Sequence, residues 1–338
     1  MRLSMFAIVA GLALCPAVVR AEEPKPLKLG IIGLDTSHVT AFTGVFNGPK
    51  ERPELAGVRV VAAYPAGSPD VEASSTRIKG FTDTLKTKYG VEIVDSVEAL
   101  LPKVDAILIE SVDGRPHLAQ LKPILKTGKP VFIDKPVAGS LADAIQIFDL
   151  AKEHKVPVFS SSSVRFYADV QALKKNEKLG SLVGCLTYSP CSLESHHPDL
   201  FWYGVHGVEA LFALMGTGCE TVSRVQTKDT EVVTGTWKDG RVATYRGIRS
   251  GKSEYGAVVF GSKAVEAQTF KGSYEPLLVE IVKFFRGGPP PVSAEETVEM
   301  FAFMEAADES KRQGGATVKI ADVLAKARAE IGKSPDAK

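Results

Sequence analysis

Short apolar runs alternate with segments of helical period through the first half of the chain. The runs have the β-branched and aliphatic composition of buried strands, and amphipathic segments separate them. They cover residues 27–34, 58–64, 104–110, 130–133 and 156–160. This alternation predicts an α/β fold in which a doubly wound parallel sheet of the Rossmann type has helices on both faces.

Several helix starts can be read from the sequence. Asp95 followed by Glu98, and Ser140 followed by Asp143, have the spacing of a capping box, and a helix is expected from Val39. Near the other end of the chain, Ser293 with Glu296 predicts a long final helix that ends at the two glycines at 314–315.

After about residue 165 the pattern changes to consecutive strand-like runs with short turns. Residues 232–237 and 241–247 flank an Asp-Gly turn, which predicts a hairpin, and residues 255–260 and 264–270 form a similar pair. These runs predict a C-terminal α+β domain with a mainly antiparallel sheet. We therefore expect a nucleotide-binding domain over 27–160 and a substrate-binding or oligomerisation domain over 161–330.

The first 21 residues have the order of a secretory signal peptide. Arg2 precedes an apolar run over 5–19, and small residues stand before an abrupt change to polar sequence. The run is shorter than the roughly 20 residues that a membrane-spanning helix needs. We expect an exported protein, periplasmic or extracellular, with no membrane partner once it is processed.

Charge and cysteine content narrow the function classes. With 41 Lys and Arg against 40 Asp and Glu, no net field favours nucleic acid or an anionic membrane. Cys185, Cys191 and Cys219 remain after processing. A disulfide between two of them is chemically permitted outside the cytoplasm, but the sequence leaves the pairing open, and burial as small apolar residues is an equal alternative.

The turn after the first run is the candidate phosphate site. A dinucleotide fold binds its pyrophosphate where Gly33, Thr36 and Ser37 stand, at a strand end that leads into a helix. The GxGxxG pattern is degenerate, because Asp35 and His38 occupy the places of its second and third glycines. Asp35 would repel a phosphate and is expected to cap the helix instead. The second run ends at Tyr64 with no acid for the ribose hydroxyls, which leaves NAD, NADP or neither open.

Two further segments carry a resemblance to a known family. Residues 104–117 and 128–138, with the tripeptide Asp134-Lys135-Pro136, resemble the glucose-fructose oxidoreductase, inositol dehydrogenase and MocA (Gfo/Idh/MocA) family, whose hallmark there is Glu-Lys-Pro. The resemblance implies an NAD(P) cofactor, hydride transfer to or from a sugar or polyol, and a possible homo-oligomer. It places the catalytic lysine at Lys135 and the cofactor beside Asp113, His117, Asp134 and Pro136.

The resemblance also implies an Asp and a His on one helix. His206 fits the histidine, whose unperturbed pKa near 6.5 suits proton transfer, but Trp202 stands in the aspartate's place. Glu209 could replace that carboxylate. The expected substrate residues are Lys135, Arg165, His197, Trp202, Tyr203 and His206. The adjacent His196 and His197 are a poor chelate without further ligands, so no metal site is expected.

Two functions stay open at this point. The first is an exported oxidoreductase, including a redox-neutral glycosidase-like variant, in which Lys135 and His206 handle the proton. The second is a non-catalytic carbohydrate- or nucleotide-binding protein that keeps the fold, which Asp35 and Trp202 favour.

Overall fold

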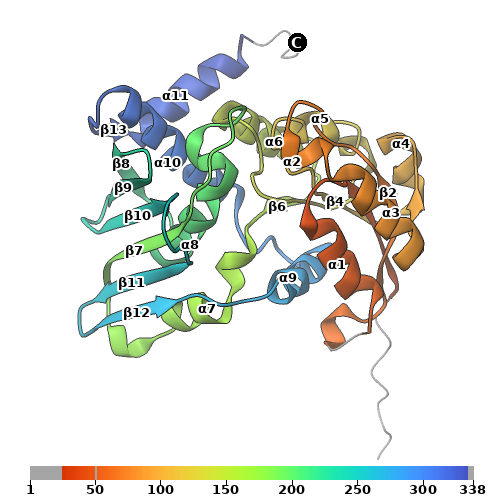
Figure 1. The fold of residues 1–338 in the computed structure, drawn as a ribbon, viewed down its shortest axis with the longest axis horizontal. Coiled ribbons are helices and arrows are strands. Elements are labelled where there is room, and N and C mark those ends of the chain that lie inside the picture. The colour runs from red at the N-terminus through yellow and green to blue at the C-terminus, as the bar shows by residue number, and fades with distance from the viewer. Residues whose placement is uncertain (1–24, 50–51, 334–338) are drawn as a thin grey trace, which may run out of the picture.

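The computed structural model describes residues 25–49 and 52–333. The predicted signal peptide at 1–21 lies outside the described residues. In Figure 1 a parallel sheet with its helices occupies one half of the molecule, and a second sheet backed by long helices occupies the other.

The first sheet has six strands that all pair in parallel, in the order β3-β2-β1-β4-β5-β6. This confirms the predicted Rossmann-type sheet. The short strand β3 was missed, because two residues carry no periodic pattern. The strands are β1 (Leu27–Ile32), β2 (Val58–Tyr64), β3 (Glu92–Ile93), β4 (Ala106–Ile109), β5 (Val131–Ile133) and β6 (Val158–Ser160).

Helices connect these strands, and three of them begin at a side-chain cap. Ser140 accepts a hydrogen bond from the Asp143 amide, as predicted, but Ser96 rather than Asp95 caps its helix, by accepting from Ala99. The cap at Ser96 thus lies one residue later than the expected cap at Asp95. The helices are α1 (Ser37–Asn47), α2 (Glu72–Ser75), α3 (Ile78–Tyr89), α4 (Val97–Leu100), α5 (His117–Leu121) and α6 (Leu141–Glu153).

The second sheet has seven strands in the order β12-β11-β7-β10-β9-β8-β13. All its pairs are antiparallel except β7 with β10, so the prediction of a mainly antiparallel sheet is confirmed. The predicted hairpin is the β9–β10 pair, with Gly240 at φ 85° in its turn. The strands are β7 (Leu182–Pro190), β8 (Cys219–Gln226), β9 (Thr230–Trp237), β10 (Val242–Ile248), β11 (Gly256–Gly261), β12 (Val265–Thr269) and β13 (Val318–Lys319).

Helices cover one face of the second sheet. The N-cap of α10 is Ser293, which accepts from the Glu296 amide, and α10 ends before the glycines at 314–315, as predicted. The opposite face carries the exposed side chains of Val225, Val242, Phe260 and Val265. The helices of this part of the chain are α7 (Ala168–Lys174), α8 (Val205–Met215), α10 (Ala294–Arg312) and α11 (Ile320–Ile331), together with α9 (Glu275–Phe285), which lies against the first sheet.

One helix from late in the chain returns to the first sheet. Figure 1 shows α9 beside α1, and its apolar side chains belong to the core that α1 and β1 form. The ring of Phe284 lies 4.8 Å from that of Phe159, which in turn lies 5.1 Å from Phe132. Full burial of each such ring stabilises the fold by about 1.5–3 kcal/mol. The return of α9 also brings Tyr274 to the carboxyl ends of the parallel strands.

Candidate functional site

The turn after β1 brings the start of α1 to the edge of a cavity. Gly33 has φ 90°, and a Cβ there would lie 2.3 Å from the Ser111 amide nitrogen, so only glycine fits. Thr36 caps α1 by accepting from the His38 amide. Thr36, Ser37 and His38 all line the cavity, as expected of residues at a phosphate-binding turn.

Asp35 does not cap α1, which corrects the expectation from the sequence. Its fully buried carboxylate accepts from the Ser74 hydroxyl at 2.6 Å and from the Val112 amide at 2.8 Å. Those two buried donors would otherwise lack a partner. Burial raises the pKa of Asp35, and the hydrogen bonds only partly oppose this. The carboxylate is therefore turned away from the start of α1 and does not line the cavity.

The segment after β2 closes over the place where a ribose acid would stand. Tyr64 does not line the cavity, and its carbonyl accepts from the Gly33 and Ala66 amides. The hydroxyl of Ser68 donates to Asp113 at 2.6 Å, and Ser74 holds Asp35 from the same segment. The chain itself thus occupies this edge of the sheet, and the side chain of Tyr64 packs against the core instead of lining the cavity.

Two residues that were predicted to bind the cofactor form bonds within the protein instead. Asp113 binds Arg115 and lies 2.9 Å from Nε2 of His197; these partners outweigh burial and hold its pKa far below the usual value. His117 is buried between the carbonyls of Ser111 and Val137, and burial lowers its pKa. Neither side chain lines the cavity, so the expectation that they contact cofactor is not met in this conformation.

The predicted tripeptide at 134–136 follows β5 and reaches the cavity through Lys135. Asp134 is 2% exposed, and its Oδ2 lies 2.5 Å from Nδ1 of His38. The Lys135 ammonium lies 5.7 Å from the centre of the Tyr203 ring, and the peptide bond to Pro136 is cis. Burial lowers the pKa of Lys135, although Asp134 partly opposes the shift. A lysine so placed can share a proton with a bound hydroxyl.

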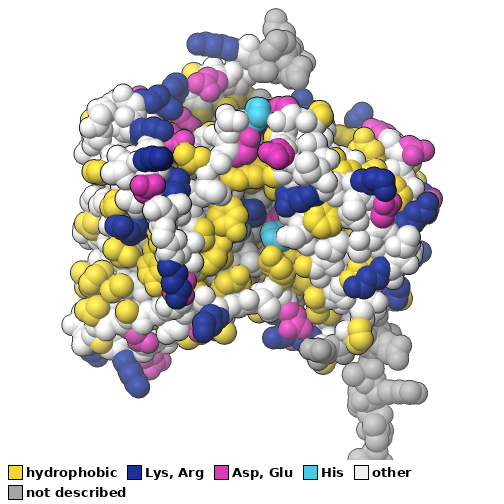
Figure 2. Space-filling view, in the orientation of Figure 1, with side chains coloured by type: hydrophobic (Ala, Val, Ile, Leu, Met, Phe, Trp, Pro, Cys, Tyr) yellow, Lys and Arg dark blue, Asp and Glu magenta, His cyan; other side chains and the backbone are white. Residues whose placement is uncertain are grey.

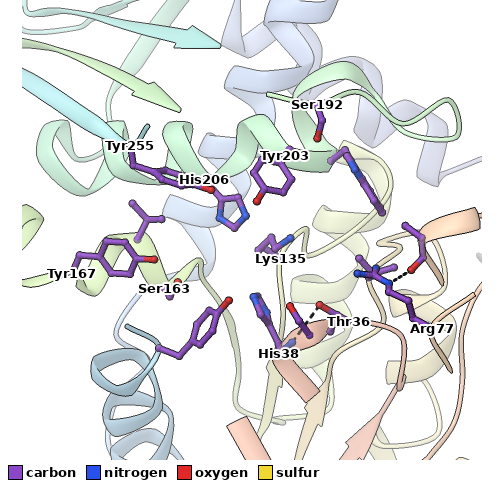
Figure 3. A pocket seen from close by; sticks show the side chains of 16 residues that line it. Thr36, His38, Arg77, Lys135, Ser163, Tyr167, Ser192, Tyr203, His206 and Tyr255 are labelled. Atoms are coloured by element: carbon purple, nitrogen blue, oxygen red, sulfur yellow. Dashed lines mark hydrogen bonds between the residues drawn. The ribbon is translucent and has the colours of Figure 1, made fainter. Parts of the chain in front are cut away.

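His206 faces Lys135 from the second half of the molecule, as Figure 3 shows. Its Nδ1 lies 2.7 Å from the Ser162 hydroxyl, and the rings of Tyr203 and Tyr255 meet it edge-on. Burial, and then the charge of Lys135, hold the pKa of His206 well below 6.5. Its imidazole is therefore neutral near pH 7.

Arg165 and Glu209 are not where the sequence suggested. Glu209 pairs with Nε of Arg165 and accepts from Ser161 at 2.7 Å, so it is not a partner of His206. Arg165 also binds Glu296 at 2.8 Å and does not line the cavity. The substrate role expected for Arg165 is thus corrected to an ion pair that joins the start of the second domain to α8 and α10. A buried guanidinium must be paired with carboxylates, because its charge has lost contact with water.

A π-helical turn, Leu200–Gly204, runs directly into α8 and supplies the aromatic wall of the cavity. Trp202 and Tyr203 line the cavity, and their contact with substrate stays a prediction. His197 does not line it; its ring lies 4.9 Å from Trp202, and its two nitrogens face Asp113 and Glu194. His197 therefore supports Trp202 from behind, which corrects its expected contact with substrate.

The cavity has a volume of about 290 Å³ and lies in the hollow that Figure 2 shows between the two halves. Among the residues that the structure describes, no Asp or Glu side chain lines it. Sequence reasoning missed several lining residues from distant segments, and no local pattern marks them. These are Ala73, Arg77, Val112, Ser163, Val164, Tyr167, Ser192, Tyr255 and Tyr274.

Glu110 is a further acid that the sequence did not single out. It follows β4, is fully buried, and its two carboxyl oxygens have no hydrogen-bond partner among the described residues. Burial raises its pKa well above the usual value, and the charges of Asp134 and Asp35 add to the effect. Burial of Glu110 thus favours the protonated form of its carboxyl group.

Three other features bear on the candidate chemistry. Within residues 25–49 and 52–333, no group of three or more His, Cys, Asp or Glu side chains is arranged to hold a metal ion. No helix in the same ranges has the length and apolar character to cross a bilayer. Cys185, Cys191 and Cys219 are buried and free.

The fold and this cavity define a two-domain α/β protein with a Rossmann-type nucleotide-binding half. Residues 27–162 match the model of an oxidoreductase family described as having an NAD-binding Rossmann fold, the GFO_IDH_MocA family. The resemblance to the Gfo/Idh/MocA family predicted from the sequence is thus confirmed over residues 27–162. It also confirms, at the level of the family, the expected nicotinamide dinucleotide as cofactor.

Individual relatives are distant. An uncharacterized oxidoreductase of Streptococcus pneumoniae is 23% identical over 161 residues, which cover 42% of this chain and 42% of that relative. A scyllo-inositol dehydrogenase of Lactobacillus casei, solved with NAD(H) and scyllo-inositol, has a TM-score of 0.71 at 15% identity, over 88% of this chain and 100% of that one. A myo-inositol dehydrogenase of the same organism, solved with NAD(H) and myo-inositol, has a TM-score of 0.67 at 18% identity, over 87% and 96%. At such identities these structures show the shared fold.

The site fits one end of a dinucleotide better than the other. The start of α1, with Arg77 and Lys135 nearby and no carboxylate in the lining, suits a diphosphate, and Lys135 and His206 suit the reacting end. The adenosine end has no acid at the end of β2, and the segment at 65–75 lies over that edge. Residues 36–38, Arg77 and Lys135 are the groups that would hold the cofactor.

Proposed function

We propose that this protein is an exported NAD(P)-dependent oxidoreductase that acts on a sugar or a polyol-like substrate. The observation that carries the proposal is the convergence of Lys135 and His206, from the two halves of the molecule, on a cavity that begins at the start of α1. The inositol-bound structures of similar fold support a polyol as substrate, and the pattern of residues 1–21 supports export.

The chain's own residues would divide the work as follows. Lys135 donates a hydrogen bond to the reacting hydroxyl or carbonyl oxygen, while His206 contacts the same substrate from α8. Trp202 and Tyr203 cover the substrate and exclude water. The bound cofactor supplies the nicotinamide that takes or gives the hydride.

The test begins with binding. The purified protein is titrated with NAD⁺, NADH, NADP⁺ and NADPH, and fluorescence of Trp202 in the cavity wall reports occupancy. Only two tryptophans exist, and Trp237 is buried in the second sheet with its indole bonded to Gly216, so Trp202→Phe should remove the response. Any ligand that co-purifies is released by denaturation and identified by mass spectrometry. The oxidoreductase proposal is refuted if the protein carries no ligand and binds none of the four nicotinamide dinucleotides.

Turnover is then measured with scyllo-inositol, myo-inositol and common aldoses. Lys135→Ala should abolish turnover with cofactor affinity retained, because the amine acts on the substrate. The exposed Lys126→Ala is the matched control and should behave as the unchanged protein. Full turnover in Lys135→Ala would remove Lys135 from its proposed role.

The alternative, a binding protein without catalysis, also has support. The segment at 65–75 is tied over the adenosine edge through Ser74 and Ser68, and Trp202 replaces an acid. Quenching of Trp202 by a sugar without any response to nicotinamide forms would favour this alternative.

A homo-oligomer is a further part of the proposal. The exposed Val225, Val242, Phe260 and Val265 lie on the uncovered face of the second sheet and support association there. Sedimentation of the purified protein tests it.

A further inference from the structure

The polar partner of His206 is a buried hydroxyl from a distant part of the chain. Nδ1 of His206 lies 2.7 Å from Oγ of Ser162, 44 positions earlier. Ser162 follows β6 and caps the short 3₁₀ helix Ser163–Phe166. Ser162 is 1% exposed and His206 is 8% exposed, so water has little access to the contact. The direction of this hydrogen bond is therefore set by the protein.

The hydrogen bonds of Ser162 determine that direction. Its Oγ accepts from the Val164 amide at 3.3 Å, and a hydroxyl has one hydrogen to donate. Among residues 25–49 and 52–333, Nδ1 of His206 is the other polar partner of this hydroxyl. If Nδ1 carried a proton, the hydroxyl hydrogen would be buried without an acceptor, which is unfavourable. Ser162 therefore donates to Nδ1, and the proton of the neutral imidazole resides on Nε2.

The ring of His206 is held so that Nε2 serves the cavity. The rings of Tyr203 and Tyr255 meet it edge-on, at 5.0 Å and 6.0 Å between centres. Because Nδ1 is taken by Ser162, Nε2 is the nitrogen left for the cavity that His206 lines. No described residue forms a hydrogen bond with Nε2. Figure 3 shows His206 and Lys135 on the same space, so Nε2–H is available to a ligand there.

A hydroxyl partner has the opposite effect to a carboxylate. A carboxylate only accepts hydrogen bonds, so it would hold a proton on the nitrogen beside it and leave the other nitrogen to act as a base. Here Trp202 stands where the resemblance implies an aspartate, and Glu209 is paired with Arg165. Nδ1 of His206 accepts from Ser162 instead, which leaves Nε2 as a donor.

The surroundings of Lys135 and His206 make them unequal in proton transfer. Burial lowers the pKa of Lys135, which suits an amine that must release and regain a proton, while Asp134 still offers its ammonium a negative charge. A second proton on His206 would place another buried cation near Lys135 without a carboxylate. Lys135 is therefore the better proton carrier.

We propose that Ser162 fixes His206 as the Nε2–H tautomer, so that His206 donates a hydrogen bond to the reacting oxygen and keeps its proton, while Lys135 carries the transferred proton. This inference rests on the proposed oxidoreductase function. In the reduction direction, the carbonyl oxygen accepts from Nε2–H of His206 and from the Lys135 ammonium. The carbonyl carbon takes the hydride with its electron pair from the reduced nicotinamide. The forming alkoxide takes one proton from Lys135, which becomes a neutral amine, and oxidation reverses both transfers. Ser162 is a positioning residue.

The tautomer can be measured without turnover. The chain has six histidines, so ¹⁵N-histidine NMR can resolve each imidazole, and the signals lost in His206→Gln identify that of His206. We expect a protonated Nε2 and an unprotonated Nδ1. Ser162→Ala should lower the ratio of Nε2–H to Nδ1–H about 2- to 12-fold, the equilibrium effect of one hydrogen bond. The exposed Ser253→Ala is the matched control and should leave the ratio unchanged. A protonated Nδ1 in the unchanged protein, or an unchanged ratio in Ser162→Ala, overturns the inference.

Turnover separates a donor from a base at position 206. His206→Leu should lower kcat by about 10²–10³-fold, the usual effect of removing one donor to a developing oxyanion. His206→Gln offers an amide N–H but no base, so its kcat should exceed that of His206→Leu at least tenfold. The dissociation constant for NADH should stay within about threefold in both variants. Equal kcat values in the two variants would assign His206 the role of base and overturn the inference.

Conservative substitution of Ser162 tests its positioning role. Ser162→Ala should lower kcat together with the tautomer ratio, and Ser162→Thr, which keeps the hydroxyl, should restore both. A loss of kcat in Ser162→Ala with no change in the tautomer would show a merely structural role and refute the inference alone. Absence of turnover in the unsubstituted protein would refute the proposed function, while NMR still decides the tautomer of His206.

Discussion

Replacement of Arg165 by methionine should destabilise the folded protein rather than weaken ligand binding. Arg165 joins Glu209 and Glu296, and its main-chain oxygen accepts from Gln171 at 2.8 Å. Methionine keeps the length and the apolar stem of the side chain but removes the charge. Glu209 is 1% exposed, and of the partners described above it would then keep only the hydroxyl of Ser161.

The expected loss of stability follows from the Glu209 carboxylate, which is left without its cation. Removal of one member of a buried ion pair costs about 3–5 kcal/mol, a large part of the 5–15 kcal/mol by which such domains are stable. At roughly 2 °C per kcal/mol for a chain of this size, Arg165→Met should lower Tm by about 6 °C or more. Urea unfolding followed by far-UV circular dichroism at pH 7 measures the free energy directly.

Two further variants make the interpretation specific. Arg165→Met combined with Glu209→Gln should recover part of the loss, because the stranded charge is gone. Arg328→Met breaks an exposed pair with Asp149 and should cost less than about 1 kcal/mol. The ion-pair argument is refuted if the free energy of unfolding of Arg165→Met lies within about 1 kcal/mol of that of the unchanged protein while ligand affinity is lost. Arg165 would then have the substrate-binding role that the sequence suggested.

Three other outcomes can be checked on the same protein. Gly33→Ala should cost at least about 1–3 kcal/mol in urea unfolding, because alanine at φ 90° is strained and its Cβ would overlap Ser111; an unchanged midpoint contradicts this. Burial alone would lower the pKa of His197, but Asp113 and Glu194 raise it above 6.5, so its contribution is full below pH 6.5 and is lost as pH rises through the raised value. Thermal stability should therefore fall above pH 6.5 more in the unchanged protein than in His197→Gln, and equal slopes would count against the pair. Burial raises the pKa of Cys185, Cys191 and Cys219 to about 12, so a thiol reagent should label them only after unfolding; rapid native labelling, or a disulfide found by mass spectrometry, would contradict the buried free thiols.

The sequence by itself determined the layers of the fold. Apolar runs of strand length, capping pairs such as Ser140 with Asp143, and the Asp-Gly turn before β10 are local signals, and each depends on residues within a few positions. The same local reading placed Lys135 at the end of β5 and His206 on a helix. Lys135 reaches the cavity because the carboxyl ends of parallel strands share an edge, and His206 lines the same cavity from α8.

Tertiary structure decided which partner each polar side chain takes. Nothing near Asp35 in sequence shows that Ser74 and Val112 bind it, nor that Asp134 meets His38 across 96 positions. Arg165 and His197 left the expected site because buried carboxylates bind them more strongly than water does. Tyr274 reaches the cavity only because α9 returns to the first core. Pairings of this kind depend on long-range packing, which one-dimensional periodicity does not encode.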